Sequence, residues 1–296
     1  MDPSDDATAA LAGRRSCSSL PGWAADDLAA ALEAFRRMPH GPLADEAARS
    51  VDPSAFFDAV FRPADPISGH VTGYYEPEIP GALARSDAFP VPLHSEPSGG
   101  CTRPRAEIDT HLEGEEIVWL RDEVDRFFAQ VQGSARIRLT DGSVLRVGYA
   151  ATNGHPYVSI GKRLIESGVF GPDITAGRLA AWLRADSERG RAVMRENPSY
   201  VFFRRLETDP AFGPTTTLGC SATAGRTLAV DVGHIPLGTP VWVEVDGSAR
   251  LCIAQDTGSA IRGAGRADLF FGTGESAGRA AGRLNHPGRL TPFLRR

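Results

Sequence analysis

Lysine is almost absent from this chain of 296 residues: Lys162 is the single one, and arginine supplies the other basic side chains. Acidic residues outnumber basic ones by 37 to 32, which gives a net charge of -5 at pH 7. No block of like charges stands out, so there is no electrostatic reason to expect binding to a nucleic acid. We therefore expect no nucleic-acid partner.

Metal-binding patterns are also missing. The four cysteines never form a C-x-x-C pair, and the seven histidines are isolated from one another. Zinc sites need such spacing, so we expect neither a metal nor a cofactor. Cys220 and Cys252 could form a disulfide in an oxidising compartment or remain buried free thiols, and the sequence leaves both open. His155 and His286 could contact a substrate or satisfy backbone groups.

Long apolar runs are absent too. No stretch approaches the ~20 apolar residues of a membrane span. Residues 1–22 carry acidic side chains and no continuous apolar core, unlike a signal peptide. Cys17 follows Gly-Arg-Arg-Ser, which is not a lipidation signal. Neither an export signal nor a lipid anchor is therefore visible in this sequence.

The remaining composition, 42% hydrophobic and 23% charged, is that of a globular protein with one large domain or two ordinary ones. The spacing of apolar residues predicts helices over 26–38, 51–66, 117–131, 159–168, 173–184 and 187–196. Alternation predicts strands at 70–77 and 199–203, two strands at 242–245 and 249–253 about a turn at Asp246-Gly247, and a hairpin over 135–149 with a primed turn at Asp141-Gly142. Strand-like runs dominate after residue 199, which indicates a small β-barrel.

Two aspartates in this strand-rich part face each other across a loop of small residues. Asp256 follows an apolar run and Asp268 precedes another, which brings both carboxylates to one edge of a sheet. The loop leaves room for a ligand through its small residues, Gly258, Ser259, Ala260, Gly263 and Gly265. A third aspartate, Asp231, has a similar setting. A hairpin with solvated aspartates would fit the same residues.

The three aspartates resemble the pattern of the 3D domain, which ends the MltA family of membrane-bound lytic murein transglycosylases. Other motifs follow in that family's order, so the resemblance covers roughly residues 70–290. They are Thr72-Gly-Tyr-Tyr-Glu-Pro77, Pro104-Arg-Ala-Glu-Ile108, Val131-Gln-Gly-Ser134, Gly148-Tyr-Ala, Asn153-Gly-His, Ser159-Ile-Gly-Lys162, Asn197-Pro-Ser-Tyr-Val-Phe-Phe203 and Asn285-His286. Two features depart from the pattern: Ser259 replaces the usual Gly, and the loop to Asp268 is slightly longer.

The resemblance implies a fold that periodicity alone cannot show. It is mainly β with several helices: a double-psi β-barrel from residues 1–80 and 206–296, an inserted β-rich domain from 81–205, and a cleft between them. The resemblance also implies a monomeric carbon–oxygen lyase that acts on peptidoglycan glycan strands. Its location would be the periplasm or the periplasmic face of the outer membrane, with a cell-wall enzyme complex or the outer membrane as further partners.

Tyrosines and hydroxyls near residue 72 are the first candidates for sugar contact. Aromatic rings stack on the apolar faces of sugars while hydroxyls bind their polar edges, which suits Thr72, Tyr74 and Tyr75. Neighbouring strand residues point to opposite faces, so at most one of the two tyrosines should face the ligand.

A second group of candidates follows the predicted helix over 117–131. Gln132, Gly133 and Ser134 could hydrogen-bond a sugar, although Gly133 could equally serve to end the helix. Lys162 could bind substrate oxygens or the peptide stem, or remain solvated, and its position in the family motif favours ligand contact.

Cleavage of a glycosidic bond needs an acid that stays protonated near neutral pH. Burial and a nearby negative charge both raise the pKa of an aspartate. Asp268 precedes Leu269-Phe-Phe271, the more apolar setting, and Asp256 can supply the like charge, so we predict Asp268 as the general acid. The resemblance points to the same residue. Asp256 would orient the sugar or stabilise positive charge, and Asp231 would first of all cap a turn.

A lytic transglycosylase needs no second catalytic carboxylate. The C6 hydroxyl of N-acetylmuramic acid attacks its own C1, and the residue that gave up a proton then accepts one, which leaves a 1,6-anhydro product. Two alternatives remain open. One is an inverting β-glycan hydrolase with Asp268 as acid and Asp256 as base. The other is a glycan-binding module without catalysis.

Overall fold

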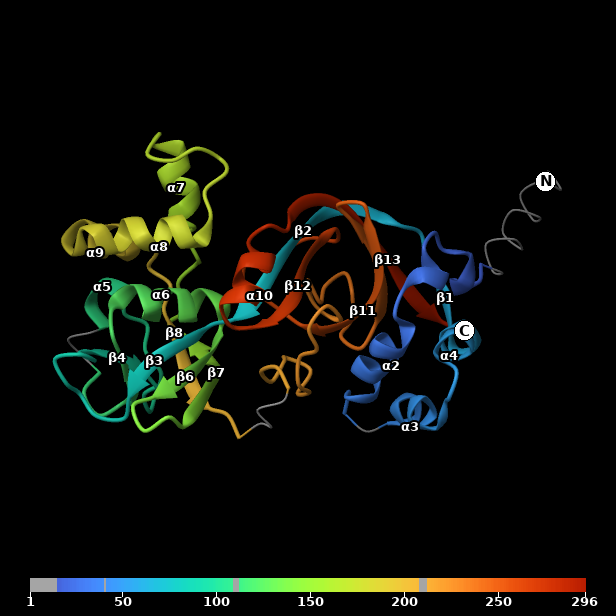
Figure 1. Ribbon diagram of the computed structural model, residues 1–296, viewed down its shortest axis with the longest axis horizontal. Coiled ribbons are helices and arrows are strands. Elements are labelled where there is room, and N and C mark those ends of the chain that lie inside the picture. Colours follow the sequence, from blue (N-terminus) through green and yellow to red (C-terminus); the bar gives the residue numbers. More distant parts are fainter. Residues whose placement is uncertain (1–14, 40, 109–111, 208–211) are drawn as a thin grey trace. The chain divides into compact units, whose positions relative to one another are not determined.

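The computed structural model describes residues 15–39, 41–108, 112–207 and 212–296 (Figure 1). The chain divides into two compact units, the first made of Met1–Tyr74, Thr215–Gly272 and Leu284–Arg296, the second of Tyr75–Pro214 and Thr273–Arg283. Residues 1–14, where the sequence lacks the features of a signal peptide, lie outside the described residues. None of the helices in the described ranges is both long and apolar enough to cross a membrane.

The first unit is a β-barrel. Its seven-stranded sheet runs β1-β13-β10-β11-β9-β12-β2 and closes because β13 also pairs with β2. The strands are β1 (Phe61–Pro63), β2 (Ile67–Glu76), β9 (Thr227–Val230), β10 (Pro240–Val245), β11 (Ser248–Asp256), β12 (Arg266–Thr273) and β13 (Asn285–Arg295). Strand β9 is parallel to β11 and antiparallel to β12. The barrel predicted for the C-terminal part is therefore present.

Alternation along the strands separates the inside of the barrel from its outside. Inward residues form one apolar cluster that includes Val71, Leu228, Ala254 and Leu269. The residues between them point outward, and part of this outer face is covered by another cluster that includes Leu251 and Ile253. A polar residue at one of these outward positions therefore lies on the external wall of the barrel.

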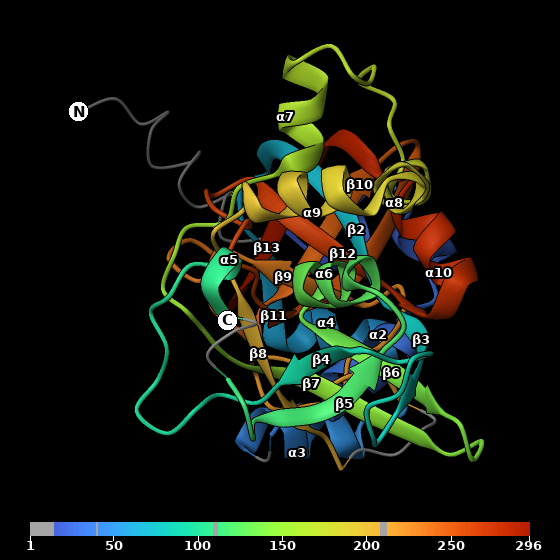
Figure 2. The same cartoon turned by 90° about the vertical axis from the view of Figure 1, so that its left-hand side faces the viewer.

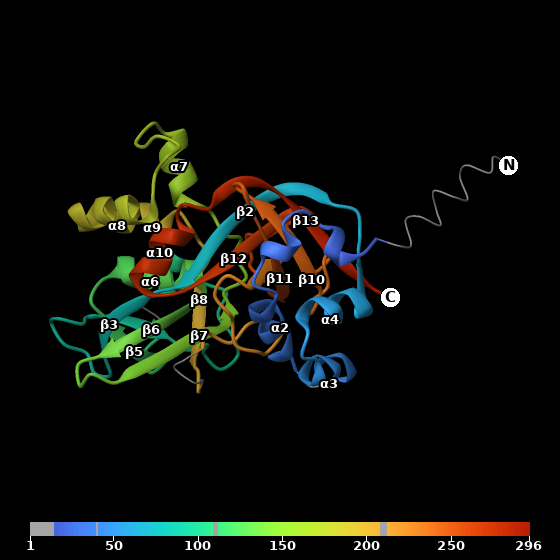
Figure 3. The ribbon, with the colours of Figure 1, turned by 45° about the vertical axis from the view of Figure 1, so that its right-hand side comes forward.

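Three helices cover that part of the outer wall, α2 (Leu28–Arg36), α3 (Pro42–Arg49) and α4 (Pro53–Val60), with the short helices η1 (Cys17–Ser19) and η2 (Trp23–Ala25). Figures 1 and 3 show them, in blue, beside strands β1, β10 and β11. Helix α2 begins where the sequence predicts, because the Asp27 carboxylate accepts the N–H of Ala30 at 3.1 Å. Asp26 ties this segment to the barrel through a buried ion pair with Arg226, 2.8 Å long.

The second unit contains a six-stranded sheet in the order β4-β5-β3-β6-β7-β8 (Figure 2). Its strands are β3 (Glu78–Ala82), β4 (Val91–His94), β5 (Glu116–Leu120), β6 (Ser134–Leu139), β7 (Val144–Thr152) and β8 (Val201–Arg205). Its helices are α5 (Arg105–Ile108), α6 (Glu123–Gln132), α7 (Ile160–Glu166), α8 (Ala176–Ala185), α9 (Ser187–Arg195) and α10 (Gly274–Ala281). An apolar cluster joins α6 to α7, α8 and α9 through Phe127, Leu164, Leu183 and Met194.

The helix predicted over 117–131 is wrong in its first part. Residues 116–120 form strand β5, which pairs with β4 and buries Val118 and Leu120. Helix α6 begins only after Asp122, whose carboxylate accepts the N–H of Asp125 at 2.8 Å. The apolar spacing of the helix continues by chance into a β-branched stretch that the sheet then stabilises.

The two predicted hairpin turns differ. Asp246 and Gly247 have φ of 49° and 70°, the primed turn that joins β10 to β11. Between β6 and β7 only Gly142 has positive φ, 85°, whereas Asp141 does not, so the primed turn predicted there is wrong. The Asp141 carboxylate instead accepts the N–H of Ser143 at 2.9 Å. A single left-handed glycine is enough when the loop is one residue longer.

Several motifs behind the family resemblance hold the second unit together. The Arg105 guanidinium is buried and donates to the carbonyls of Asn197 and Ser199 at 3.1 and 2.6 Å. The Asn153 side chain donates to the carbonyl of Pro198 at 2.8 Å. These residues therefore fix the path of the chain into β8.

The cysteines of the barrel are not linked. Cys220 and Cys252 are both free thiols and both buried. Of the two alternatives that the sequence leaves open, the structure has the buried thiols.

Candidate active site

Asp256 and Asp268 lie on either side of the same residue of strand β9. Ala229 pairs with Asp256 on β11 and with Asp268 on β12. Adjacent strands are ~4.8 Å apart, so the backbones that carry the two carboxylates are about 10 Å apart. The register agrees with the prediction that both carboxylates come to one edge of a sheet, since Asp256 ends β11 and Asp268 lies near the start of β12.

A bulge in β11 determines which side of the barrel Asp256 occupies. Ala254 pairs with Leu228 and points inward, whereas Asp256, two residues later, pairs with the outward Ala229. Gln255 is the extra residue. Its side chain is fully buried, accepts the Thr227 hydroxyl at 2.6 Å and donates to the carbonyl of Ala34 at 2.7 Å.

Two further strands complete this outer patch. Ala267 and Leu269 point inward on β12, so Arg266, Asp268 and Phe270 share the outer face. Val71 points inward on β2, which leaves Thr72 and Tyr74 outside. The rings of Tyr74 and Phe270 pack together with centroids 5.1 Å apart.

The Asp256 carboxylate is surrounded by donors. Oδ1 accepts the N–H and the hydroxyl of Thr217 at 3.0 and 2.9 Å, and the N–H of Thr257 at 3.0 Å. Oδ2 accepts the Tyr74 hydroxyl at 2.9 Å. Four donors fix the position of this carboxylate.

Asp268 has far fewer partners. Oδ1 accepts the Thr72 hydroxyl at 2.7 Å, and within the described chain no protein group hydrogen-bonds to Oδ2. Burial raises the pKa of Asp268 from 3.8 to about 6, against the opposing effects of the Thr72 hydrogen bond and the Arg266 charge. The negative charge of Asp256 also raises this pKa, but less than burial does. Both causes predicted from the sequence act, and burial dominates.

Tyr74 is a donor in this site. Burial and then the negative charge of Asp256 raise its pKa well above the usual 10. The phenol therefore stays protonated at neutral pH and can only donate to Asp256. Tyr75, the next residue on β2, packs its ring against Gly278 of helix α10. A Cβ on that glycine would lie only 2.8 Å from the ring. The opposite orientation expected for the two tyrosines fits these contacts.

Asp231 braces two loops. Its Oδ2 accepts the N–H of Gly263 at 2.7 Å and its Oδ1 that of Gly233 at 3.0 Å. These backbone hydrogen bonds, that from Gly263 first, lower the pKa of Asp231. The carboxylate therefore stays ionised and holds the loop between β11 and β12 near the end of β9.

The small residues of that loop have different reasons to be small. A Cβ on Gly258 would come within 2.9 Å of the Ile261 side chain, and Ser259 and Ala260 are exposed. A Cβ on Gly265 would meet the carbonyl of Ser68 at 2.4 Å, where the loop crosses β2. Gly265 is therefore needed for backbone packing, and the interpretation that it leaves room for a ligand is wrong.

Besides Tyr75, four candidates from the sequence belong to the second unit. Gln132 accepts the N–H of Tyr75 at 3.1 Å, and Gly133, with φ of 75°, ends helix α6. Ser134 is buried at the start of β6. The Lys162 ammonium is largely exposed and lies 3.7 Å from Glu166. Gly133 thus has the helix-ending role that the sequence offers as one alternative.

Two residues of the barrel patch were not predicted, Thr217 and Arg266. Arg266 stands two positions before Asp268 on one strand, and the alternation of strand faces could have identified it. Thr217 lies on a loop 39 residues before Asp256 in the chain, and its hydroxyl donates to the Asp256 carboxylate. No local pattern connects the two.

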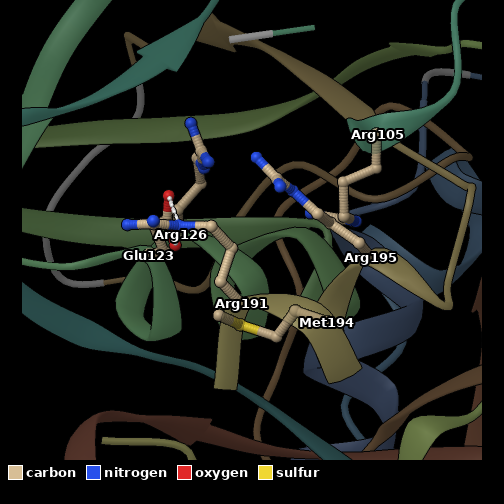
Figure 4. A pocket seen from close by; sticks show the side chains of 6 residues that line it. All are labelled: Arg105, Glu123, Arg126, Arg191, Met194 and Arg195. Carbon is tan, nitrogen blue, oxygen red and sulfur yellow. Dashed lines mark hydrogen bonds and ion pairs between the residues drawn. The ribbon is translucent and has the colours of Figure 1, made fainter. Parts of the chain in front are cut away.

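The second unit contains a cavity of about 20 Å³ that is lined mainly by arginines (Figure 4). This volume holds about one water molecule. Its lining residues are Arg105, Glu123, Arg126, Arg191, Met194 and Arg195. The Glu123 carboxylate accepts Arg191 Nε at 2.9 Å, so its charge is already engaged. Among the described residues, no three His, Cys, Asp or Glu side chains gather as a metal ion would require.

Comparisons with known proteins cover both units. A family model described as the MltA specific insert domain matches residues 100–204, and one described as the 3D domain matches residues 226–294. Membrane-bound lytic murein transglycosylase A of Escherichia coli strain K12 is 35% identical over 237 residues, which are 74% of this chain and 64% of the relative. The match thus spans less than two thirds of that relative's length.

Solved structures are similar over almost the whole chain. A membrane-bound lytic murein transglycosylase from Agrobacterium tumefaciens is 30% identical with a TM-score of 0.81, covering 95% of this chain and 96% of the other. E. coli MltA with bound chitohexaose is 27% identical with a TM-score of 0.74, covering 91% and 89%. These likenesses confirm the predicted fold class, a mainly β double-psi barrel that carries an inserted β-rich domain.

Proposed function

Because the chain belongs to the MltA family, we propose that it is a lytic transglycosylase that cleaves the β-1,4 bond between N-acetylmuramic acid and N-acetylglucosamine in peptidoglycan. The observation that carries this proposal is Asp268: a carboxyl with pKa of about 6 and one oxygen without a protein partner in the described chain. Such a group can hold a proton near neutral pH and release it. The chitohexaose bound to E. coli MltA supports a glycan as the substrate class.

The first step protonates the bond that breaks. Protonated Asp268 donates its proton to the glycosidic oxygen, the bond from that oxygen to C1 breaks, and positive charge develops on the muramic acid ring. Burial raises the proton affinity of this carboxyl, so the acid is available below a pH of about 6.

The second step uses the carboxylate just formed. Asp268 accepts the proton of the C6 hydroxyl while that oxygen bonds to C1, which closes the 1,6-anhydro ring and restores the acid. No water enters, and one aspartate serves as acid and then as base. The Asp256 carboxylate, held in place by four donors, would stabilise the positive charge that develops between the steps.

The hydrolase alternative asks more of Asp256 than its surroundings offer. A general base must have a lone pair directed at a water molecule, yet each oxygen of Asp256 already accepts protein hydrogen bonds. Oδ1 already accepts three of these bonds, so an activated water would be limited to the remaining lone pair of Oδ2, beside the Tyr74 hydroxyl. The same crowding suits a fixed negative charge, so we prefer the mechanism with a single catalytic carboxyl.

We also propose the domain limits and substrate contacts that the sequence predicts. The catalytic domain would be residues 1–80 with 206–296, and residues 81–205 the inserted domain. Substrate contacts would come from Thr72, one of Tyr74 and Tyr75, Gln132, Gly133, Ser134, Lys162, Asp231, Gly258, Ser259 and Ala260. We place the enzyme in the periplasm or at the periplasmic face of the outer membrane, because its substrate lies there.

Product analysis on purified sacculi tests the proposed reaction. We expect the full chain to release muropeptides with 1,6-anhydro ends, detected by mass spectrometry, and Asp268→Asn to release none while still binding sacculi. Asp246→Asn is the matched control, since it makes the same chemical change in a primed turn that accommodates Asn. Reducing muramic acid ends would support the hydrolase instead, and binding without any turnover by the unmodified chain would support the glycan-binding module.

A further inference from the structure

We propose that Arg266 is a positioning residue for Asp268: acting through the Thr72 hydroxyl, it determines which carboxyl oxygen carries the transferred proton. This inference rests on the proposed function, in which Asp268 is the acid, and concerns the direction from which that acid acts. Three side chains on two strands carry it, with Thr72 on β2 between Arg266 and Asp268 on β12.

The first step of the argument is the direction of two hydrogen bonds. Arg266 Nη2 lies 2.9 Å from Thr72 Oγ1, and Thr72 Oγ1 lies 2.7 Å from Asp268 Oδ1. A guanidinium can only donate, so the Thr72 oxygen must accept from Arg266. The single hydroxyl proton of Thr72 is then left to point at Asp268. A threonine without this neighbour could turn its proton elsewhere.

The second step concerns the proton on Asp268. Because Oδ1 accepts the Thr72 hydroxyl hydrogen, it is favoured as the carbonyl oxygen of the protonated acid, which places the acidic proton on Oδ2. Oδ2 is the oxygen without a protein partner in the described chain, so this is also the one that can reach a glycosidic oxygen. The relay therefore turns a symmetric carboxyl into an acid with one donating side, and orientation of this kind is a large part of enzymatic rate enhancement.

The third step is the rigidity of the arginine. Arg266 Nη1 donates to the carbonyls of Ala267 and His70, at 2.6 and 3.3 Å. The planar fork thus bridges the two neighbouring strands before it reaches Thr72, which a lysine could not reproduce. These contacts hold the guanidinium in place when no substrate is present.

Charge acts alongside geometry. The charged or titratable groups that face Asp268 are Arg266 on its own strand, Asp256 on β11 and Tyr74 on β2. Strand β9 adds none, since its sequence is Thr-Leu-Ala-Val. The Arg266 charge and the Thr72 hydrogen bond both lower the pKa of Asp268 against the larger effect of burial. Loss of either should therefore raise the pH at which Asp268 ionises.

The test measures this ionisation directly. We would follow the side-chain carboxyl ¹³C resonance of Asp268, assigned by its loss in Asp268→Asn, through a pH titration of the full chain without substrate. Arg266→Gln and Thr72→Val should each raise the midpoint by about 1 pH unit. In the Thr72→Val background, Arg266→Gln should add less than half of its single effect, because the path through the hydroxyl is gone. Arg289→Gln, which removes a charge paired with Glu244 elsewhere on the barrel, should change nothing.

Equal effects of Arg266→Gln in both backgrounds would overturn the relay and leave only a charge effect, and an unchanged midpoint in the single variants would overturn both. Thermal melting of each variant shows whether it is folded, and Thr72→Val keeps the volume of the side chain. On sacculi, both variants should lower kcat more than KM and shift the alkaline limb of the pH profile upward. Since the titration needs no turnover, it still decides the relay if the unmodified chain proves inactive on sacculi.

Discussion

The surroundings of Asp256 and Asp268 differ sharply although the two residues share one neighbour, Ala229. Among the described residues, Asp256 accepts four hydrogen bonds, from Thr217, Thr257 and Tyr74, whereas Asp268 accepts one from a side chain. The first arrangement holds a carboxylate rigidly in place, whereas burial in the second makes ionisation of Asp268 costly. Chemically identical side chains on one barrel wall are thus prepared for different tasks by the donors around them.

Turnover should separate the two aspartates most strongly. Asp268→Asn removes the proton carrier and should lower the rate on sacculi by about 10³-fold or more. Asp256→Asn removes a fixed charge and should lower it by about 10- to 100-fold. Rates of muropeptide release by both variants, beside Asp246→Asn, make the measurement. Equal losses at the two positions would mean that Asp256 also transfers a proton, as the hydrolase mechanism requires.

Substitution of the two aspartates by Asn should change the stability of the protein in opposite directions at pH 8. The folded state raises the pKa of Asp268 from 3.8 to about 6, so the stability that this residue contributes is present below pH 3.8 and is lost as the pH rises through 6. At pH 8, Asp268→Asn should therefore be more stable than the unmodified chain, by on the order of 2 kcal/mol, and at pH 4 nearly equal to it.

Asp256→Asn should behave in the opposite way at pH 8. The neutral amide loses charge-assisted hydrogen bonds and sets an N–H₂ group against donors, which should cost about 1–2 kcal/mol. Thermal melting of both variants at pH 4 and pH 8 tests the pair. A destabilised Asp268→Asn at pH 8 would show that its carboxyl is not strained by burial.

The smallest effect is expected from removing a single donor to Asp256. Thr217→Val removes one of the four donors to Asp256 but keeps the backbone N–H of residue 217. We expect a loss of about 1 kcal/mol in stability and a 2- to 5-fold lower rate, of roughly the size of one hydrogen bond. Kinetics on sacculi and melting temperatures would measure both. A loss as large as that of Asp256→Asn would mean that Thr217 itself contacts the substrate.

Local patterns predicted much of this molecule. The helix capped by Asp27, the Asp246-Gly247 turn and the strand-rich C-terminal part each follow from residues close together in sequence. Asp268 was identified as the acid candidate because its apolar neighbours are adjacent to it. These features depend on interactions within a few residues, which a single sequence records directly.

Features made by distant segments could not be predicted in this way. Periodicity extended the 117–131 helix into β5 because it cannot register pairing with β4. Thr217 reaches Asp256 and Thr72 reaches Asp268 only after the barrel closes. The inserted domain was predicted from the family resemblance alone, because no local sequence pattern marks the two boundaries of an insertion.

The bulge at Gln255 has a consequence for anyone who redesigns this protein. Counting by twos from Ala254 would assign Asp256 to the valine-rich interior, where an ionised group would have no water and no donor. If β11 were straightened into a regular ladder with every amino acid retained, the carboxylate would turn inward and the outer patch would lose its negative pole. Grafting the Asp256 loop onto another barrel therefore requires the irregular step before it as much as the aspartate itself.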